Sequence, residues 1–322
     1  MKTGDSGLAW QDRDNRQQGS ESIARAFLQG GGEMGAFIRQ KDWARSPLGS
    51  TENWPHSLRS AVSICLGSGF PIAIYWGPEL ALLYNDAWRP ILGANHPWAL
   101  GQAANEVWPE IWDTIGPLFE HVMTTGEATR SKDQLLAMRW HGYTEECYFD
   151  YTFSPIRGES GQVEGIFNAV LETTGRVIGE RRLHTVRELA GRVSEARTAE
   201  LVCRVIAHTL GNAFADIPFA VLYLLSSDGT EARLAGSAGL NAGAPAAPAS
   251  IPLSGPEDMP GGLAASAAWP VAQVVRTGVA RLVDDLDRRF SPLPGGPWPE
   301  SPTSALVLPV PRAGRERPMA CW

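Results

Sequence analysis

Three groups of residues have types and spacings that chemistry could use, and the first is a glycine-rich segment. Residues 30–35, Gly-Gly-Gly-Glu-Met-Gly, match the glycine spacing of a dinucleotide-binding loop. Such a loop needs a strand before it and a helix directly after it, within a β-α-β unit. A short amphipathic helical segment (22–28) precedes these glycines instead, and no β-α-β pattern follows. We therefore interpret residues 30–35 as a linker.

The other two groups contain side chains that bind metals. His141, Glu145 and Cys147 have a spacing that fits no common zinc site, so we predict no metal there. His96 and His121 are the candidate haem ligands, and we interpret both as ordinary surface or packing residues. The sequence also contains no nucleophile elbow, Walker loop or HExxH motif. These residues therefore predict no enzyme, and they leave the identity of any cofactor unknown.

Composition narrows the function classes. The chain has 322 residues, enough for about two domains, and a net charge of −7 with scattered basic residues, which argues against nucleic-acid binding. The uncharged run 60–78 contains Gly67, Gly69 and Pro71, which favour a helix, a turn and a strand over a membrane span. The N-terminal segment is polar and lacks the features of a signal peptide. We expect a soluble, cytoplasmic protein without membrane contact.

The first half of the chain has the pattern of an α+β domain with an antiparallel sheet. Apolar spacing predicts a helix that ends at Leu66, and a β-hairpin over 71–85 follows it. Short helices, interrupted by prolines, are expected over 86–121. Three strands joined by short turns come next, which predicts an antiparallel meander. Their expected ranges are 129–140, 143–156 and 163–171.

The second half begins with helices and continues with strands. Residues 176–210 carry two apolar stripes at helical spacing, the first formed by Leu183, Val186, Leu189, Ala190, Val193 and Ala196. Strands are expected over 219–225 and 231–236, and a short helix over 267–276. Two more strands are expected over 279–283 and 305–310, which predicts a second α+β domain.

The order of the first-half elements resembles that of a PAS domain, and three segments resemble PAS motifs. In Leu82–Trp88 (LLYNDAW), the resemblance implies a helix cap by Asn85 or Asp86. The segment 101–112 (GQAANEVWPEIW) resembles the PAS segment with an acidic residue before Trp-Pro. The segment 172–176 (ETTGR) resembles the end of a PAS domain, with Thr173 in place of the usual aliphatic residue. It implies that Glu172, Thr174 and Arg176 couple the sheet to the next helix.

Longer segments are similar to the N-terminal PAS–GAF region of bacterial hybrid sensor histidine kinases. They are 42–62, 181–198, 216–229 and 292–310. The resemblance implies a flexible tail (1–32), a helical leader packed on the PAS domain (33–70), the PAS domain (71–175), a signalling helix (176–198) and a GAF domain truncated at its C-terminus (199–322). It also implies that a strand missing after Pro318 leaves an unpaired edge in the GAF sheet.

Aromatic residues of the first domain suggest a ligand cavity between sheet and helices. The alternative is that they only fill the core, and the number of large side chains favours core filling. The ligand-pocket candidates are Trp76, Trp88, Trp108, Trp112, Phe153 and Phe167.

These features together predict a sensory module of two-component signal transduction. It would detect a small molecule or a partner, act as a parallel homodimer through the linker helix, and work with a response regulator or a kinase. His184 lies on that helix but lacks the acidic residue and proline that follow a phosphoacceptor histidine. Two alternatives stay open: a histidine-kinase fragment without its catalytic core, and a ligand-free adaptor whose only activity is dimerisation.

Overall fold

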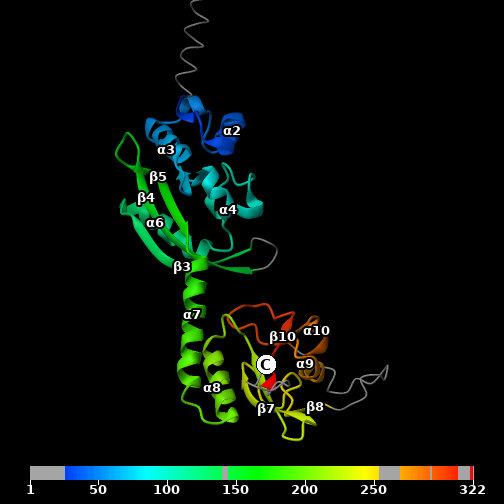
Figure 1. The fold of residues 1–322 in the computed structure, drawn as a ribbon. Helices are drawn as coiled ribbons and strands as arrows, with labels where there is room; N and C mark the ends of the chain where they lie inside the picture. The colour runs from blue at the N-terminus through cyan, green and yellow to red at the C-terminus, as the bar shows by residue number, and fades with distance from the viewer. Residues whose placement is uncertain (1–25, 140–143, 254–268, 291, 311–319, 322) are drawn as a thin grey trace, which may run out of the picture. The chain divides into compact units, whose positions relative to one another are not determined.

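The computed structural model describes residues 26–139, 144–253, 269–290, 292–310 and 320–321. The chain divides into two compact units, Met1–Val177 and Ile178–Trp322 (Figure 1). Each unit contains an antiparallel sheet with flanking helices, so the fold class is α+β. Within the described residues, no helix combines the length and the apolar character that crossing a membrane requires.

The sheet of unit 1 has five antiparallel strands in the order β2-β1-β5-β4-β3. They are β1 (Ile72–Trp76), β2 (Ala81–Tyr84), β3 (Thr129–Arg139), β4 (Thr144–Arg157) and β5 (Val163–Glu172). The hairpin and the meander predicted from apolar alternation are both confirmed. The long strands β4 and β5 alternate buried and half-buried residues, because one face of the sheet carries the core.

Short helices connect β2 to β3. They are η4 (Asp86–Trp88), α4 (Arg89–Leu92), η5 (Gly93–Asn95), α5 (Ala104–Val107) and α6 (Trp112–Thr125). The prolines and glycines of this stretch keep most of these helices to about one turn. Only α6 is longer, and it packs against β4 and β5.

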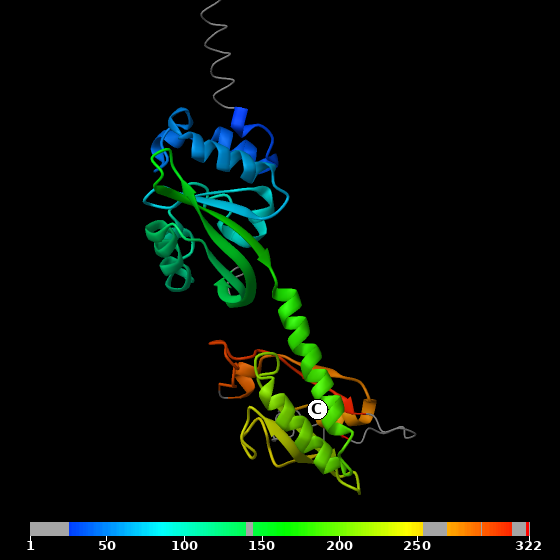
Figure 2. The same cartoon turned by 90° about the vertical axis from the view of Figure 1, so that its left-hand side faces the viewer.

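The leader before the sheet consists of η1 (Ala26–Leu28), α2 (Gly32–Gln40), η2 (Trp43–Arg45), η3 (Thr51–Asn53) and α3 (His56–Gly67). It lies at the end of unit 1 away from the start of the helix that follows β5 (Figure 2). Leu28, Met34 and Ile38 are buried in the same apolar cluster as the sheet. The expected boundary of the tail at residue 32 is therefore wrong, because residues from 27 onward already pack on the core.

Two helices follow β5, α7 (Thr174–Val193) and α8 (Ala199–Asn212). Thr198 caps α8, accepting a hydrogen bond from the backbone N–H of Leu201 at 3.2 Å. α7 contains Gly175, Gly179 and Gly191, and a Cβ at any of them would meet no atom within 4 Å. The surroundings of α7 would therefore accommodate a larger side chain at these positions.

The main sheet of unit 2 has the strand order β11-β12-β6-β7-β8. Its strands are β6 (Ala220–Leu225), β7 (Glu231–Ala238), β8 (Ser250–Pro252), β11 (Pro309–Val310) and β12 (Ala320–Cys321). A second small sheet pairs β9 (Arg281–Val283) with β10 (Ala305–Val307). α8 packs on β6 and β7, while α9 (Val271–Thr277) and α10 (Leu286–Arg289) contribute to a separate apolar cluster.

The edge of β6 differs from the expectation of a missing strand. β12 pairs with β6 through Ala320 opposite Leu224 and Cys321 opposite Tyr223. It also pairs with β11 on its other side. The segment after Pro318 therefore forms part of the strand that was expected to be absent. Among the described residues, β12 pairs with β6 at these two levels.

Candidate functional site

A small cavity lies between the sheet of unit 1 and its short helices. Its volume is about 40 Å³, whereas pockets for drug-sized ligands have about 300–1,000 Å³. Its size suits a water molecule or two and excludes a haem group. The lining consists of Tyr75, Trp88, Ile91, Trp108, Ile111, Ile115, Leu136, Met138, Phe149, Tyr151, Phe153, Asn168 and Val170.

Several lining residues carry polar atoms. The indole N–H of Trp108 donates to the Tyr75 hydroxyl at 3.0 Å, and Asn168 Nδ2 donates to the Thr152 carbonyl at 3.0 Å. The indole nitrogen of Trp88 is buried and has no hydrogen-bond partner. Burial also raises the pKa of Tyr151, which keeps its phenol protonated. The Trp88 indole N–H can therefore donate a hydrogen bond to an occupant the size of a water molecule.

Three of the six aromatic candidates line this cavity: Trp88, Trp108 and Phe153. Trp76 follows the cavity-lining Tyr75 on β1, so strand alternation turns its side chain to the opposite face. Phe167 likewise precedes the cavity-lining Asn168 on β5. The register of these strands, which no local pattern encodes, places both residues away from the cavity.

Trp112 lines a different hollow, on the outside of α6. There it lies beside Gly116, Leu80 and Met123, and its ring centroid is 5.7 Å from that of Phe119. Trp112 is half-buried. It therefore belongs to the surface of unit 1 and not to the internal cavity.

The described histidines do not line the internal cavity. The Nδ1 atom of His96 is 2.9 Å from the Tyr84 hydroxyl, and its ring meets Phe37 edge-on. Burial and the nearby Arg89 guanidinium lower the pKa of His96. His121 is exposed on α6, and His184 is exposed on α7. His141 lies outside the described residues, among which no cluster of metal-binding side chains occurs.

Asn85 and Asp86 both cap helices, but not the same helix. Asn85 caps η4, with its Oδ1 accepting from the backbone N–H of Trp88 at 3.2 Å. Its Nδ2 donates to the carbonyls of Cys65, Ser68 and Phe70, so it ties α3 to the hairpin. Asp86 instead accepts from the backbone N–H groups of Glu33 and Met34 at the start of α2. The cap that the sequence predicted is thus Asn85, and Asp86 holds the leader.

The junction between β5 and α7 is a network of polar side chains. Thr174 Oγ1 accepts from the backbone N–H of Tyr148 on β4 at 3.0 Å. Thr173 Oγ1 donates to Asp133 Oδ1 at 2.8 Å, and Arg176 forms an ion pair with the same carboxylate. The backbone N–H of Thr173 also donates to the Tyr148 carbonyl at 2.8 Å. The first turn of α7 is therefore tied directly to β3 and β4.

Asp133 reaches this junction because its strand is irregular. It has φ +47° and lies in a bulge where the β3–β4 register shifts. Its backbone N–H donates to Asp150 Oδ1 at 2.7 Å, which holds the bulge. The side chain of Glu172, the third coupling candidate, is exposed at the end of β5. The sequence analysis did not identify Asp133, Asp150 or Thr173 as site residues. Asp133 and Asp150 lie within expected strands, where aspartate is uncommon, and this could have marked them.

The residues of the expected apolar stripe that belong to α7 lie on two different faces of this helix. Leu189 packs against a cluster that contains Leu210 and Ala220, whereas Leu183 and Val186 are 48% and 61% exposed. On the packed face, Arg181 donates to Asp216 Oδ2 at 2.6 Å and to Oδ1 at 3.0 Å. Arg182 Nε donates to Asp216 Oδ1 at 2.9 Å. These bonds lower the pKa of Asp216 and fix α7 on unit 2.

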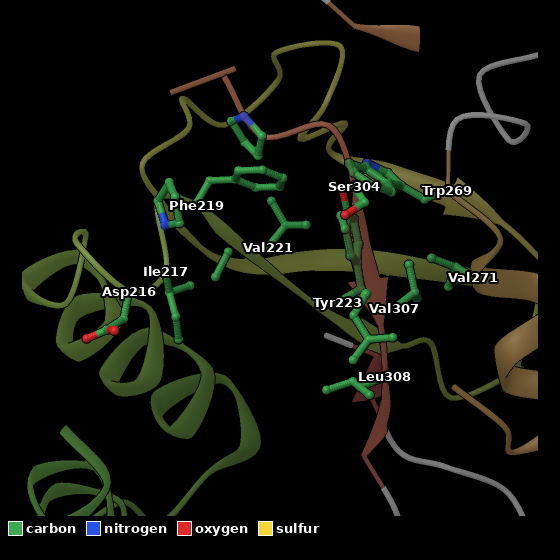
Figure 3. A pocket seen from close by; sticks show the side chains of 15 residues that line it. Asp216, Ile217, Phe219, Val221, Tyr223, Trp269, Val271, Ser304, Val307 and Leu308 are labelled. Atoms are coloured by element: carbon green, nitrogen blue, oxygen red, sulfur yellow. The ribbon is translucent and has the colours of Figure 1, made fainter. Parts of the chain in front are cut away.

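Unit 2 contains a larger cavity of about 410 Å³, which the sequence analysis did not predict. Figure 3 shows Ile217, Phe219 and Val221 on one side of it and Ser304, Val307 and Leu308 on the other. Tyr223, Trp269 and Val271 also line it, so its lining is mainly apolar. No local pattern marks this cavity, because its two sides come from segments about 85 residues apart.

No protein-family model matches the chain. Among solved structures, a sensory box sensor histidine kinase from Vibrio cholerae is 16% identical, with a TM-score of 0.26, and the match covers 36% of this chain and 86% of that one. The GAF domain of an Acinetobacter phosphoenolpyruvate-protein phosphotransferase is 22% identical, with a TM-score of 0.29 and coverage of 44% and 74%. The PAS domain of the histidine kinase ThkA is 20% identical, with a TM-score of 0.25 and coverage of 31% and 98%.

Proposed function

We propose that this chain is a cytoplasmic sensory module of two-component signal transduction. It detects a small molecule or a partner through its two α+β units and passes the change on through α7. The chain itself transfers no phosphoryl group, and it acts on a response regulator or a kinase. The junction of Asp133, Thr173, Thr174 and Arg176 carries this proposal, because it joins the sheet of unit 1 to the helix that leads into unit 2.

The physical logic of the relay is a hydrogen-bonded hinge. A change in the packing of β3 or β4 moves Asp133 or Tyr148, and both are bonded to the first turn of α7. A helix responds to such a change through its exit angle or its stability. Signal relay by this route therefore does not need one residue that contacts both the ligand and the output partner.

Homodimerisation is proposed to occur through α7. Leu183 and Val186 are spaced as neighbours on one helix face and are both exposed, and Ala190 continues that face. The face that packs on unit 2 is a different one, marked by Arg181, Leu189 and the ion pair with Asp216. A second copy of α7 in parallel orientation would cover Leu183 and Val186.

A chimera with an active histidine-kinase core tests the relay. Thr174→Ala and Arg176→Ala should each change the signal-dependent kinase activity at least about fivefold, a typical size for coupling between sites. Arg187→Ala, at an exposed position of the same helix, is the matched control. Unchanged regulation in both junction variants would show that α7 does not receive its signal through these residues.

Two alternatives have distinct outcomes. If the chain is a histidine-kinase fragment without its catalytic core, the purified protein will transfer no phosphate from ATP, and phosphate transfer would contradict both this alternative and the proposal. If it is a ligand-free adaptor, native mass spectrometry will find a dimer without added mass, and the small-molecule part of the proposal will fail.

A further inference from the structure

The hollow on the outside of α6 has the volume of a ligand site. It measures about 540 Å³, and sites for small ligands have about 300–1,000 Å³. Residues of α6 form most of its lining, and Pro78 and Leu80 of the β1–β2 turn form the rest. It shares no lining residue with the internal cavity of unit 1. We call it the outer hollow.

One wall of the outer hollow is the indole ring of Trp112. A Cβ at Gly116 would lie 3.1 Å from the Nε1 and Cε2 atoms of this ring, so the indole lies against bare helix backbone one turn further on. The buried Phe119 contacts the ring from the core, with the two centroids 5.7 Å apart. Glycine within a helix costs about 1 kcal/mol relative to alanine. The position of the indole accounts for that cost here.

A second wall comes from a leucine in an unusual conformation. Leu80 has φ +53° and ends the β1–β2 turn, where its N–H donates to the Gly77 carbonyl at 3.0 Å. The left-handed region suits glycine and costs most other residues about 1–2 kcal/mol. The leucine side chain packs on the apolar cluster of unit 1, as does that of Met123, and both line the outer hollow. The outer hollow therefore has apolar and aromatic walls.

The charged side chains of the described lining are all negative. Asp113 and Glu120 lie two turns apart on α6, are exposed, and have no ion-pair partner among the described residues. Asp113 lies in the first turn, where the helix dipole by itself favours an acidic residue. Glu120 lies further along α6, where this reason does not apply. Between them, Pro117 lacks the N–H that would bond the Asp113 carbonyl oxygen, which leaves a further acceptor.

These groups distinguish between classes of occupant. The two carboxylates repel an anion, whereas a cation is attracted both to them and to the face of an indole. An extended peptide would need a free strand edge. β2 is the edge strand here, and it is already bonded to the chain at 101–102, since the Leu82 N–H donates to the Gln102 carbonyl and the Gly101 N–H donates to the Leu82 carbonyl. The outer hollow therefore favours a small cation.

We propose that the outer hollow binds a small organic cation, a primary ammonium group on an apolar body. The ammonium group lies beside the Trp112 indole and the Glu120 carboxylate, and Asp113 adds to the negative charge. The apolar body packs on Leu80 and Met123. This adds a ligand site to the proposed sensory module. Its binding is measured without a kinase, so failure of this site and failure of the relay through α7 are distinguishable.

Phenethylammonium tests the outer hollow in the full chain, and phenethyl alcohol is the neutral probe of nearly the same shape. Calorimetry should give one phenethylammonium per chain, and the alcohol should bind at least about tenfold more weakly because it lacks the charge. Added salt should weaken binding of the cation and not of the alcohol. In NMR spectra, the indole N–H signal that disappears in Trp112→Phe should shift on binding. A shift of the Trp88 signal in its place would assign the ligand to the internal cavity and overturn the proposal.

Paired substitutions of carboxylates by amides complete the test. Asp113→Asn combined with Glu120→Gln should weaken phenethylammonium binding at least about fivefold. Glu106→Gln combined with Glu195→Gln changes the net charge equally at two exposed positions outside the hollow, and should leave binding unchanged. All four side chains are exposed, so both variants should fold. Equal effects of the two pairs, or equal binding of the two probes, would contradict the proposal. Binding of a lysine-rich peptide without binding of phenethylammonium would overturn it in favour of a protein partner.

Discussion

Asp86 caps a helix that begins 54 residues before it in the chain, at Gly32. Its Oδ1 accepts a hydrogen bond from the backbone N–H of Met34 at 2.7 Å, and its Oδ2 accepts from that of Glu33 at 3.0 Å. The residue at the N-cap position of α2, Gly31, has no side chain to do this. The leader and the sheet of unit 1 are thus joined by a helix cap, which makes the leader part of the folding unit.

Removal of this cap should destabilise unit 1. We expect Asp86→Ala to lower the free energy of unfolding by about 1–2 kcal/mol, the usual cost of losing a helix cap. Urea denaturation followed by tryptophan fluorescence measures the change. Glu79→Ala, at an exposed position of the β1–β2 turn, is the control and should change it by less than about 0.5 kcal/mol. Equal stabilities of the two variants would mean that α2 does not need Asp86.

Glycine is required where the leader meets that carboxylate. Gly32 has φ +56°, and a Cβ there would lie 1.8 Å from Asp86 Oδ2. Gly30 has φ +75° but open space around it. Gly32→Ala should therefore cost clearly more than Gly30→Ala, which loses only about 1 kcal/mol through backbone strain. Thermal unfolding of the two variants makes the comparison, and equal losses would show that the carboxylate can move aside.

The Thr173 hydroxyl should stabilise the first turn of α7. Thr173→Val keeps the shape but removes the donor to Asp133, so we expect a loss of about 1 kcal/mol and faster hydrogen exchange in the first turn of α7. Thr173→Ser retains the hydroxyl and should restore slow exchange. A valine variant that exchanges as slowly as the original chain would show that the Thr173 hydroxyl is not needed to hold the first turn of α7.

Because the pKa of Asp216 is lowered, the stability of unit 2 should depend on pH. Hydrogen bonds from Arg181 and Arg182 lower the pKa of this carboxyl group in the folded chain below its ordinary value of 3.8. The stabilisation is therefore complete above about pH 4 to 5 and is lost as the pH falls through the lower, folded pKa. Asp216→Asn should reduce stability at pH 7 by about 1–3 kcal/mol. The difference between the variant and the original chain should shrink as the pH falls below 4, which urea titrations at several pH values can measure.

The buried cysteines should react slowly with thiol reagents. Burial raises the pKa of the Cys65 and Cys147 thiols to about 12, and it also raises the pKa of Cys203. At pH 8 the reactive thiolate is therefore scarce in the folded chain. In a Cys321→Ser variant, Ellman's reagent should label the native protein at least about a hundredfold more slowly than the protein in urea. Rapid labelling of the native protein would indicate that unit 1 or unit 2 opens readily.

Local patterns were sufficient for features that depend on neighbours in the sequence. The hairpin, the meander and the helix α8 follow from apolar spacing, and Asn85 caps the helix that begins beside it. They were insufficient where distant segments meet. Trp76 and Phe167 are on the far face because of strand register, Asp86 caps α2 across 52 residues, and Asp133 reaches Thr173 through a bulge.

The glycines of α7 change what this helix is able to transmit. Each interior glycine costs about 1 kcal/mol relative to alanine, and α7 contains Gly175, Gly179 and Gly191 without needing the space. Its helical state is therefore only weakly favoured by its own residues and depends on Asp133 near one end and Asp216 further along. Loss of the contacts with either carboxylate would shorten the helical part of residues 174–193. In the proposed relay, the output of α7 is then the number of helical turns that it holds.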